Sequence, residues 1–181
     1  MIKKIISLGI VLVVSIELFS ACSEISYNVG FEGKGMFGRK YLDEDKETSQ
    51  WHLSTIVYSL GEMKALCEEW NNSAYQESDQ NFSIEQNKKI REYNEAYFKN
   101  KAVIICSSWF GGEDKIPKIS GVKVEGTQLI INIHYKYIHL GEMVNSVAYF
   151  WLFLIEVKKA DIAGVTNMLI KDKDREQNWQ L

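Results

Sequence analysis

The sequence contains few of the residues from which metal and catalytic sites are built. It has three histidines, three cysteines and one proline among its 181 residues. Only His134 and His139 lie near each other, and residues with that spacing in a strand face opposite sides. Ser107 and Ser108 follow an apolar stretch, but no G-x-S-x-G pattern surrounds them. We therefore predict no metal, no cofactor and no covalent catalysis.

A strong charge of either sign is also missing. The chain carries 21 Lys and Arg residues against 24 Asp and Glu residues, which gives a formal net charge of −3. A mildly acidic chain has no general electrostatic attraction to nucleic acid. We therefore predict no nucleic-acid partner.

The N-terminus has the parts of a secretory signal peptide. A basic Lys3-Lys4 pair precedes a largely apolar run over residues 5–16, and the small pair Ser20-Ala21 precedes Cys22. The basic residues stay inside while the apolar run enters the membrane, and a peptidase closes around the small residues. We predict a signal peptide at residues 1–21.

The segment Ser20-Ala21-Cys22 resembles the lipobox of bacterial lipoproteins. The resemblance implies that the Cys22 thiol receives a diacylglycerol and becomes the new N-terminus, at the outer face of the cell membrane. Two acyl chains anchor a protein stably, whereas one binds only marginally. The alternative is an uncleaved membrane helix, but a span needs about 20 apolar residues, and Glu17 puts a charge at the end of a shorter run.

Residues 22–50 are predicted to form a tether and an irregular segment. Residues 33–38 match the pattern G-x-G-x-x-G. A dinucleotide site needs a strand before this motif and a helix after it. Here a tether precedes the motif and the charged residues 43–47 follow it, so we interpret the motif as a flexible glycine-rich segment.

Residues 51–170 show strand and helix patterns in turn. Ser59 and Glu62 have the spacing of a capping box, which begins a helix that ends near Trp70. The apolar residues 102–106 and 147–157 indicate strands covered on both faces, and the second is predicted to be central. The other predicted elements are a strand at 51–58, a helix from 84 to about 98, and a hairpin of residues 118–125 and 128–137 around Gly126-Thr127, with a bulge at Ser120-Gly121.

These elements predict one α+β domain at residues 51–170, with a mostly antiparallel sheet and two helices packed on one face. The charged residues 171–181 are predicted to form a polar C-terminal tail. Cys67 and Cys106 each lie in an apolar stretch, which favours unpaired, buried thiols. Outside the cytoplasm the two thiols could also pair.

The loop Trp109-Phe110-Gly111-Gly112 is the strongest candidate for a binding site. It follows a buried strand, and exposed aromatic side chains often anchor a partner protein. The alternative, to which we give equal weight, is a loop that folds back and caps the core.

Residues 93–170 resemble small uncharacterised lipoproteins of Gram-positive bacteria. The similar segments are residues 93–98 before the apolar strand, the hairpin around Gly126, and residues 148–151, which lead into residues 155–159. More remotely, this region resembles the C-terminal domain of the protease-complex protein PrcB. The resemblance implies a non-enzymatic module that binds a partner.

The sequence therefore predicts a membrane-tethered protein-binding module outside the cytoplasm, with an envelope protein or peptide as its partner. Two alternatives stay open. One is a cell-envelope hydrolase with an unrecognised site, which requires a pocket of converging polar groups. The other is an envelope assembly factor whose exposed sheet edge pairs with a partner strand.

Overall fold

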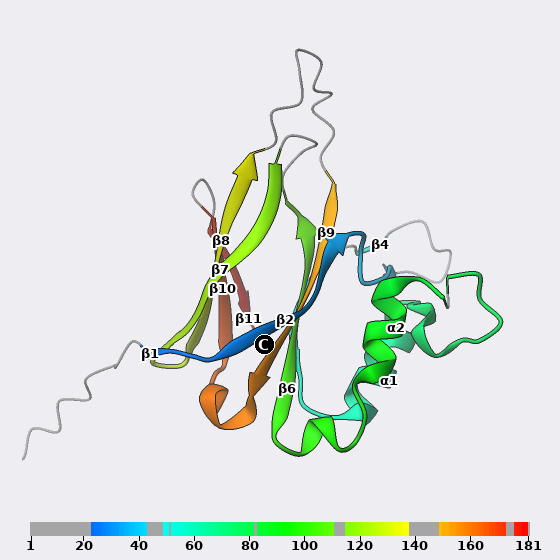
Figure 1. The fold of residues 1–181 in the computed structure, drawn as a ribbon, viewed down its shortest axis with the longest axis horizontal. Helices are drawn as coiled ribbons and strands as arrows, with labels where there is room; N and C mark the ends of the chain where they lie inside the picture. The colour runs from blue at the N-terminus through cyan, green and yellow to red at the C-terminus, as the bar shows by residue number, and fades with distance from the viewer. Residues whose placement is uncertain are drawn as a thin grey trace, which may run out of the picture.

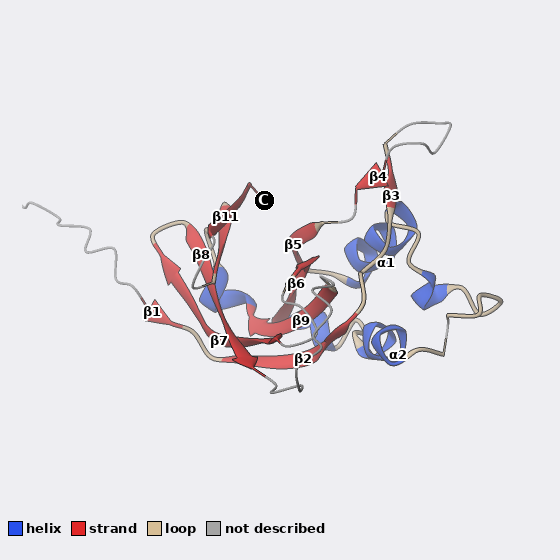
Figure 2. Ribbon diagram, turned by 90° about the horizontal axis from the view of Figure 1, so that it is seen from above, coloured by secondary structure: helices blue, strands red, loops and turns tan. Residues whose placement is uncertain are grey.

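The computed structural model describes residues 23–42, 49–50, 52–81, 83–110, 115–137, 149–172 and 176–180. The predicted signal peptide and Cys22 lie outside these residues, as do Gly111 and Gly112. The described residues form three layers (Figure 1; Figure 2). A four-stranded sheet is the middle layer, between a five-stranded sheet and two α-helices.

The four-stranded sheet has the strand order β2-β9-β6-β5 and is antiparallel throughout. Its strands are β2 (Tyr27–Lys34), β9 (Phe150–Lys158), β6 (Lys101–Trp109) and β5 (Leu53–Val57). Strand β9 pairs along its whole length with β6 on one side, and its residues 151–157 pair with β2 on the other. This confirms the prediction that the apolar run ending at residue 157 is a central strand.

The five-stranded sheet has the order β1-β7-β8-β10-β11. Its strands are β1 (Ser23–Glu24), β7 (Lys115–Glu125), β8 (Gln128–Tyr137), β10 (Asn167–Lys171) and β11 (Glu176–Gln180). Only the β8–β10 pair of this sheet is parallel. A separate two-stranded ladder joins β3 (Lys40–Tyr41) to β4 (Ser49–Gln50).

The β7–β8 hairpin has the predicted turn and bulge. Gly126 adopts a φ of 59° in the turn, a conformation that suits glycine. The register shifts between Ile119 and Gly121, where the sequence loses its two-residue apolar period. Both predictions are confirmed.

Strands β6 and β9 are buried on both faces of the middle sheet. Because side chains alternate along a strand, each strand contributes to two cores. The core between the sheets includes Ala102, Ile104, Cys106, Leu129, Ile131, Phe153, Ile155 and Met168. The core beneath the helices includes Met63, Cys67, Ile90, Val103, Ile105, Leu152 and Leu154.

Helix α1 (Leu60–Glu69) begins as the sequence predicts. Its N-cap residue, Ser59, accepts a hydrogen bond at 3.1 Å from the backbone N–H of Glu62. The Glu62 carboxylate accepts one at 2.7 Å from the backbone N–H of Tyr58. Ser59 thus satisfies a backbone N–H group of the first turn, as predicted, whereas Glu62 accepts from the residue before the N-cap and not from Ser59 itself.

Helix α2 (Glu85–Glu92) is shorter than predicted. It ends because Tyr93 leaves the helical path and enters the core beneath the helices, together with Phe98 from a short 3-10 helix, η2 (Tyr97–Lys99). Two further 3-10 helices are η1 (Ser73–Tyr75) and η3 (Lys159–Ile162). Both α-helices cover one face of the four-stranded sheet (Figure 2), so the predicted α+β class is confirmed.

Two segments predicted to be irregular belong to the sheets. Residues 27–34 of the predicted tether form β2, and residues 176–180 of the predicted polar tail form β11. A bulge between Val29 and Phe31 interrupts the alternation of β2. Strand β11 lies at a sheet edge, where backbone pairing is possible without an apolar face. The sequence of β2 does have the apolar period of a strand, with Tyr27, Val29 and Phe31 two residues apart, whereas that of β11 does not.

Cys67 and Cys106 are free and buried, which confirms the prediction of unpaired thiols. They belong to different cores, Cys67 beneath the helices and Cys106 between the sheets. Burial raises the pKa of each thiol to about 12. Both thiols therefore stay protonated and unreactive at neutral pH.

The place of β2 beside β9 gives the first prediction. A chain that begins at Trp51 lacks β2 and leaves one edge of a central strand unpaired. We expect it to lose the cooperative thermal transition that a chain beginning at Ser23 shows. Circular dichroism melting compares the two chains. An equally sharp transition at the same temperature would show that β2 is dispensable.

Candidate functional site

The structure divides the predicted binding loop into two parts. Trp109 is 42% exposed, and its ring lies 4.2 Å from that of Phe150, centre to centre. Phe110 is 1% exposed and packs edge-on against Phe153 in the core between the sheets, at 5.7 Å. Trp109 thus fits the prediction of an exposed anchor, and Phe110 fits the alternative of a core cap.

Further aromatic side chains lie at the strand ends near Trp109. We call Trp109, Tyr137, Tyr149 and Phe150 the aromatic rim. Trp109 ends β6 opposite Phe150, which begins β9. Tyr137 ends β8 and is 57% exposed. Figure 1 places the end of β8 (yellow) and the start of β9 (light orange) at the same end of the molecule.

Two lysines lie against the rings of the rim. The Lys34 ammonium group lies 4.0 Å from the ring centre of Tyr149, and that of Lys115 lies 5.5 Å from the ring centre of Tyr137. An ammonium group over an aromatic face is attracted by the negative face of the ring. The rim therefore combines apolar surface with positive charge.

The first described residues lie at the end of the five-stranded sheet that is far from the aromatic rim. Ser23 pairs with Val124, close to the turn of the β7–β8 hairpin, whereas Lys115 pairs with Tyr137 at the other end. A strand rises about 3.3 Å per residue, so the two ends of β7 lie about 30 Å apart. The start of the described chain and the aromatic rim are therefore well separated.

A histidine and a serine meet across β5 and β6. His52 Nδ1 lies 2.9 Å from Ser108 Oγ, and Ser108 lies opposite Trp151 of β9. Burial lowers the pKa of His52, so the ring is neutral at pH 7. Ser108 has no exposed surface, so a substrate cannot reach its hydroxyl group in this arrangement. The pair satisfies a buried hydroxyl group and gives no support to a hydrolase.

The other candidate chemical groups stay apart. Cys106 faces the core between the sheets, whereas His134 is exposed on the outer face of β8. In the part of the chain that the structure describes, no group of His, Cys, Asp and Glu side chains could hold a metal ion. Among the described helices, none is long and apolar enough to cross a membrane.

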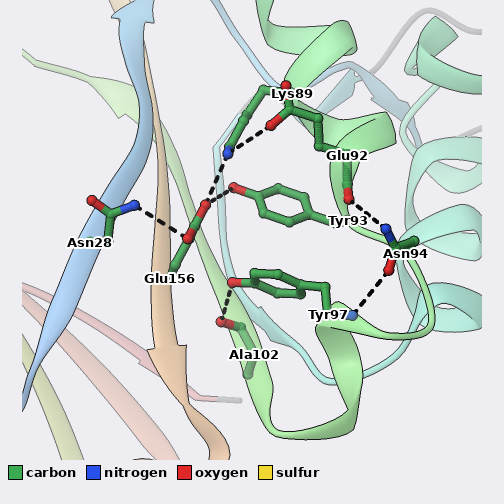
Figure 3. A network of polar contacts seen from close by, with 8 residues as sticks. All are labelled: Asn28, Lys89, Glu92, Tyr93, Asn94, Tyr97, Ala102 and Glu156. Atoms are coloured by element: carbon green, nitrogen blue, oxygen red, sulfur yellow. Dashed lines mark hydrogen bonds and ion pairs between the residues drawn. The ribbon is translucent and has the colours of Figure 1, made fainter.

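A network of polar groups joins the middle sheet to α2 (Figure 3). The Glu156 carboxylate on β9 lies 3.1 Å from the Lys89 ammonium group of α2. It also accepts hydrogen bonds of 3.3 Å from Asn28 on β2 and from the Tyr93 hydroxyl group. Lys89 makes a second ion pair, at 2.9 Å, with Glu92. Sequence analysis did not identify this network, whose members come from three distant segments.

The network shifts the pKa values of its charged members. Burial alone raises the pKa of Glu156, but hydrogen bonds from Lys89, Asn28 and Tyr93 and the charge of Lys89 outweigh burial and lower it. Burial alone lowers the pKa of Lys89, but the Glu92 and Glu156 carboxylates outweigh burial and raise it. The charged forms of both groups are therefore favoured in the folded protein.

Gly30 makes room for the network. A Cβ atom at this position would lie 2.5 Å from both the Glu156 carboxylate and the Tyr93 hydroxyl oxygen, and 2.9 Å from Lys89 Cε. These distances are shorter than van der Waals contact. The bulge of β2 thus places a residue without a side chain where the carboxylate needs space.

No protein-family model matches the chain, and comparisons with curated proteins and with solved structures find no match.

The lowered pKa of Glu156 predicts a dependence of stability on pH. Its contribution is present above the ordinary carboxyl pKa and is lost as the pH falls through the lowered value. At pH 7, Glu156→Gln is expected to lower the free energy of unfolding by about 1–3 kcal/mol, because it removes a charged partner from Lys89. The difference from the wild type is expected to shrink at pH 3.

Urea denaturation at both pH values measures this difference. Glu68→Gln is the matched control, because Glu68 is exposed on α1 and should change stability little at either pH. If Glu156→Gln and Glu68→Gln behave alike at pH 7, the network does not stabilise the fold.

Proposed function

We propose that this protein is a lipid-anchored module at the outer face of the cell membrane that binds an envelope protein or peptide without catalysing a reaction. Two features of the sequence support this location: the signal-like residues 1–21 and the lipobox-like residues before Cys22. Among the described residues, Ser108 beside His52 has no exposed surface and Cys67 and Cys106 are buried, so these candidate nucleophiles favour binding over catalysis.

The observation that carries the proposal is the separation between Ser23 and the aromatic rim. Strand β1 begins directly after Cys22 and pairs near the hairpin turn of β7 and β8. A lipid on Cys22 would hold this end of the module at the membrane surface. The rim, about 30 Å along the strands, would then face away from the membrane.

The rim has the chemistry of a protein-binding surface. Trp109 and Tyr137 expose large rings, and aromatic residues supply much of the binding energy at protein interfaces. Lys34 and Lys115 add positive charge, so the matching partner presents apolar and acidic side chains. A tether confines both proteins to a thin layer and raises their effective concentration.

The anchor predicts a mass change that depends on Cys22. Protein extracted from membranes is expected to have an intact mass that begins at Cys22 and includes acyl chains. Cys22→Ala is expected to lack this species, because it has no thiol to modify. An unmodified full-length mass in both proteins would contradict lipidation and indicate an uncleaved signal anchor.

The rim predicts where a partner can be captured. A photo-reactive amino acid at position 109 is expected to cross-link a defined envelope protein on intact cells. The same amino acid at position 127, in the hairpin turn near the predicted anchor, is the control and is expected to capture a different set of neighbours. No adduct at position 109, or identical adducts at both positions, would contradict a partner site at the rim.

A further inference from the structure

Strand β5 forms an edge of the four-stranded sheet that lacks the usual protection. It is the last strand in the sheet order, and among the described strands it pairs with β6 alone (Figure 2). Edge strands commonly contain charged residues, proline or a bulge, which prevent pairing with another chain. The residues Leu53–Val57 include neither charge nor proline, and their register with β6 does not shift. By contrast β2, at the other edge, has a bulge after Val29 and the charged residues Glu32 and Lys34.

A groove of about 440 Å³ lies between β5 and helix α1. Thr55 and Val57 line it from the strand, and Ala65 and Leu66 line it from the helix. Ile56 lines it too, although its side chain faces the core between the sheets. The groove therefore reaches the backbone of β5 at the sheet edge.

One face of α1 forms the second wall of the groove. The helix residues that line it have the i, i+3, i+4, i+7 spacing of a single face, and they are Glu62, Ala65, Leu66 and Glu69. The neighbouring face, with Met63 and Cys67, enters the core beneath the helices. Because a helix rises about 1.5 Å per residue, Glu62 and Glu69 lie about 10 Å apart along its axis.

The groove has a negative charge. Its described lining residues include Glu62 and Glu69 but no Lys or Arg. Lys40, which does not line the groove, forms an ion pair with Glu69 at 2.6 Å. The Glu62 carboxylate accepts its hydrogen bond from a neutral group, the backbone N–H of Tyr58. One lysine thus balances one of the two carboxylates, and a basic partner complements the other.

This charge favours a basic peptide over a second copy of the chain as the occupant. Two copies joined edge to edge at β5 would be related by a two-fold axis, which brings their α1 helices side by side. Glu62 and Glu69 of one copy would then lie close to the same carboxylates of the other. Like charges across an interface are unfavourable, whereas basic side chains of a peptide are attracted.

The spacing of the groove defines a sequence pattern for the peptide. In a strand added beside β5, every second side chain points to the same face, and residues four apart lie about 13 Å from each other. An apolar side chain in the groove therefore has neighbours on its own face two residues before and after it. Long basic side chains at those two positions can reach Glu62 and Glu69.

We infer that β5 binds an extended peptide of the pattern basic-x-apolar-x-basic, which adds to the four-stranded sheet as a further strand. Backbone hydrogen bonds to β5 supply affinity, and the groove selects the side chains. The inference does not depend on the lipid anchor or on the aromatic rim. The two surfaces also differ in charge, since the lysines of the rim favour an acidic partner.

A labelled peptide with the sequence Thr-Lys-Thr-Leu-Thr-Lys-Thr tests the pattern by fluorescence anisotropy. It is expected to bind saturably with a Kd of about 1 mM or tighter. The isomer Thr-Thr-Lys-Leu-Lys-Thr-Thr has the same charge, but its lysines point away from the groove when its leucine points in. It is expected to bind about threefold more weakly or worse, because two exposed ion pairs are lost. No saturable binding of the first peptide, or equal affinity for both isomers, would overturn the inference.

Ala65→Lys tests whether the peptide occupies the groove. Ala65 is exposed on α1 and lysine is a good helix former, so the melting temperature is expected to change little. The new side chain fills the groove and repels a basic peptide, so affinity is expected to fall about tenfold or more.

Glu68→Lys is the control for Ala65→Lys. It changes the charge of the same helix by twice as much, but Glu68 is exposed and does not line the groove. Its effect on affinity is expected to stay below about threefold, because salt screens exposed charges. Equal losses in the two variants would mean that the peptide responds only to the overall charge of α1, and would overturn the assignment to the groove.

Hydrogen exchange distinguishes strand addition from loose electrostatic binding. The first peptide is expected to slow the exchange of backbone amides within residues 53–57, because an added strand covers this edge. Amides of β2, at the other edge of the sheet, are the control and are expected to be unaffected. Saturable binding without slower exchange in β5 would overturn strand addition.

Light scattering tests a second copy of the chain as the occupant. The wild type is expected to stay monomeric at the concentrations that the peptide titration uses. A dimer that Ala65→Lys abolishes would overturn the peptide as the occupant and assign the β5 edge to a second copy.

Discussion

The structure depends on the burial of β6 and β9 on both faces. A sheet whose central strands have no polar face must be covered on both faces. Here a second sheet covers one face and two helices cover the other. Polar groups in those strands must then find partners inside the protein. Ser107 pairs with the segment after β2, Ser108 with His52 before β5, and Glu156 with Lys89 on α2. The requirement to satisfy these groups thus positions the surrounding elements.

Local patterns in the sequence predicted the elements that local physics determines. The Ser59–Glu62 cap, the turn at Gly126 and the apolar runs each depend on neighbouring residues. Strand β2 was missed although Tyr27, Val29 and Phe31 alternate as in a strand, and Tyr27 and Phe31 pack against the two cores. Strand β11 has no such pattern and pairs only at a sheet edge. Gly30 in β2 leaves space for the Glu156 carboxylate. The two residues are far apart in the sequence, so no local pattern indicates that glycine is needed at position 30.

The candidate sites were less predictable than the fold for the same reason. The sequence identified Trp109 and Phe110 together, but only the strand register separates the exposed ring from the buried one. It also singled out residues 33–38, and it set them aside because a tether was predicted before them in place of a strand and charged residues follow them in place of a helix. In the fold, β2 does lead into them, and residues 34–38 line one pocket together with residues from the start of α2.

The segment after β2 connects the aromatic rim with a pocket beside the start of α2. Lys34 lies over the ring of Tyr149, and the backbone N–H of Gly35 donates to the carbonyl group of Phe150, so both residues touch the rim. The next residues form the wall of the pocket, with Phe37 fixed to Ser107. The backbone segment that follows β2 of the doubly covered sheet thus lies between the aromatic rim and this pocket.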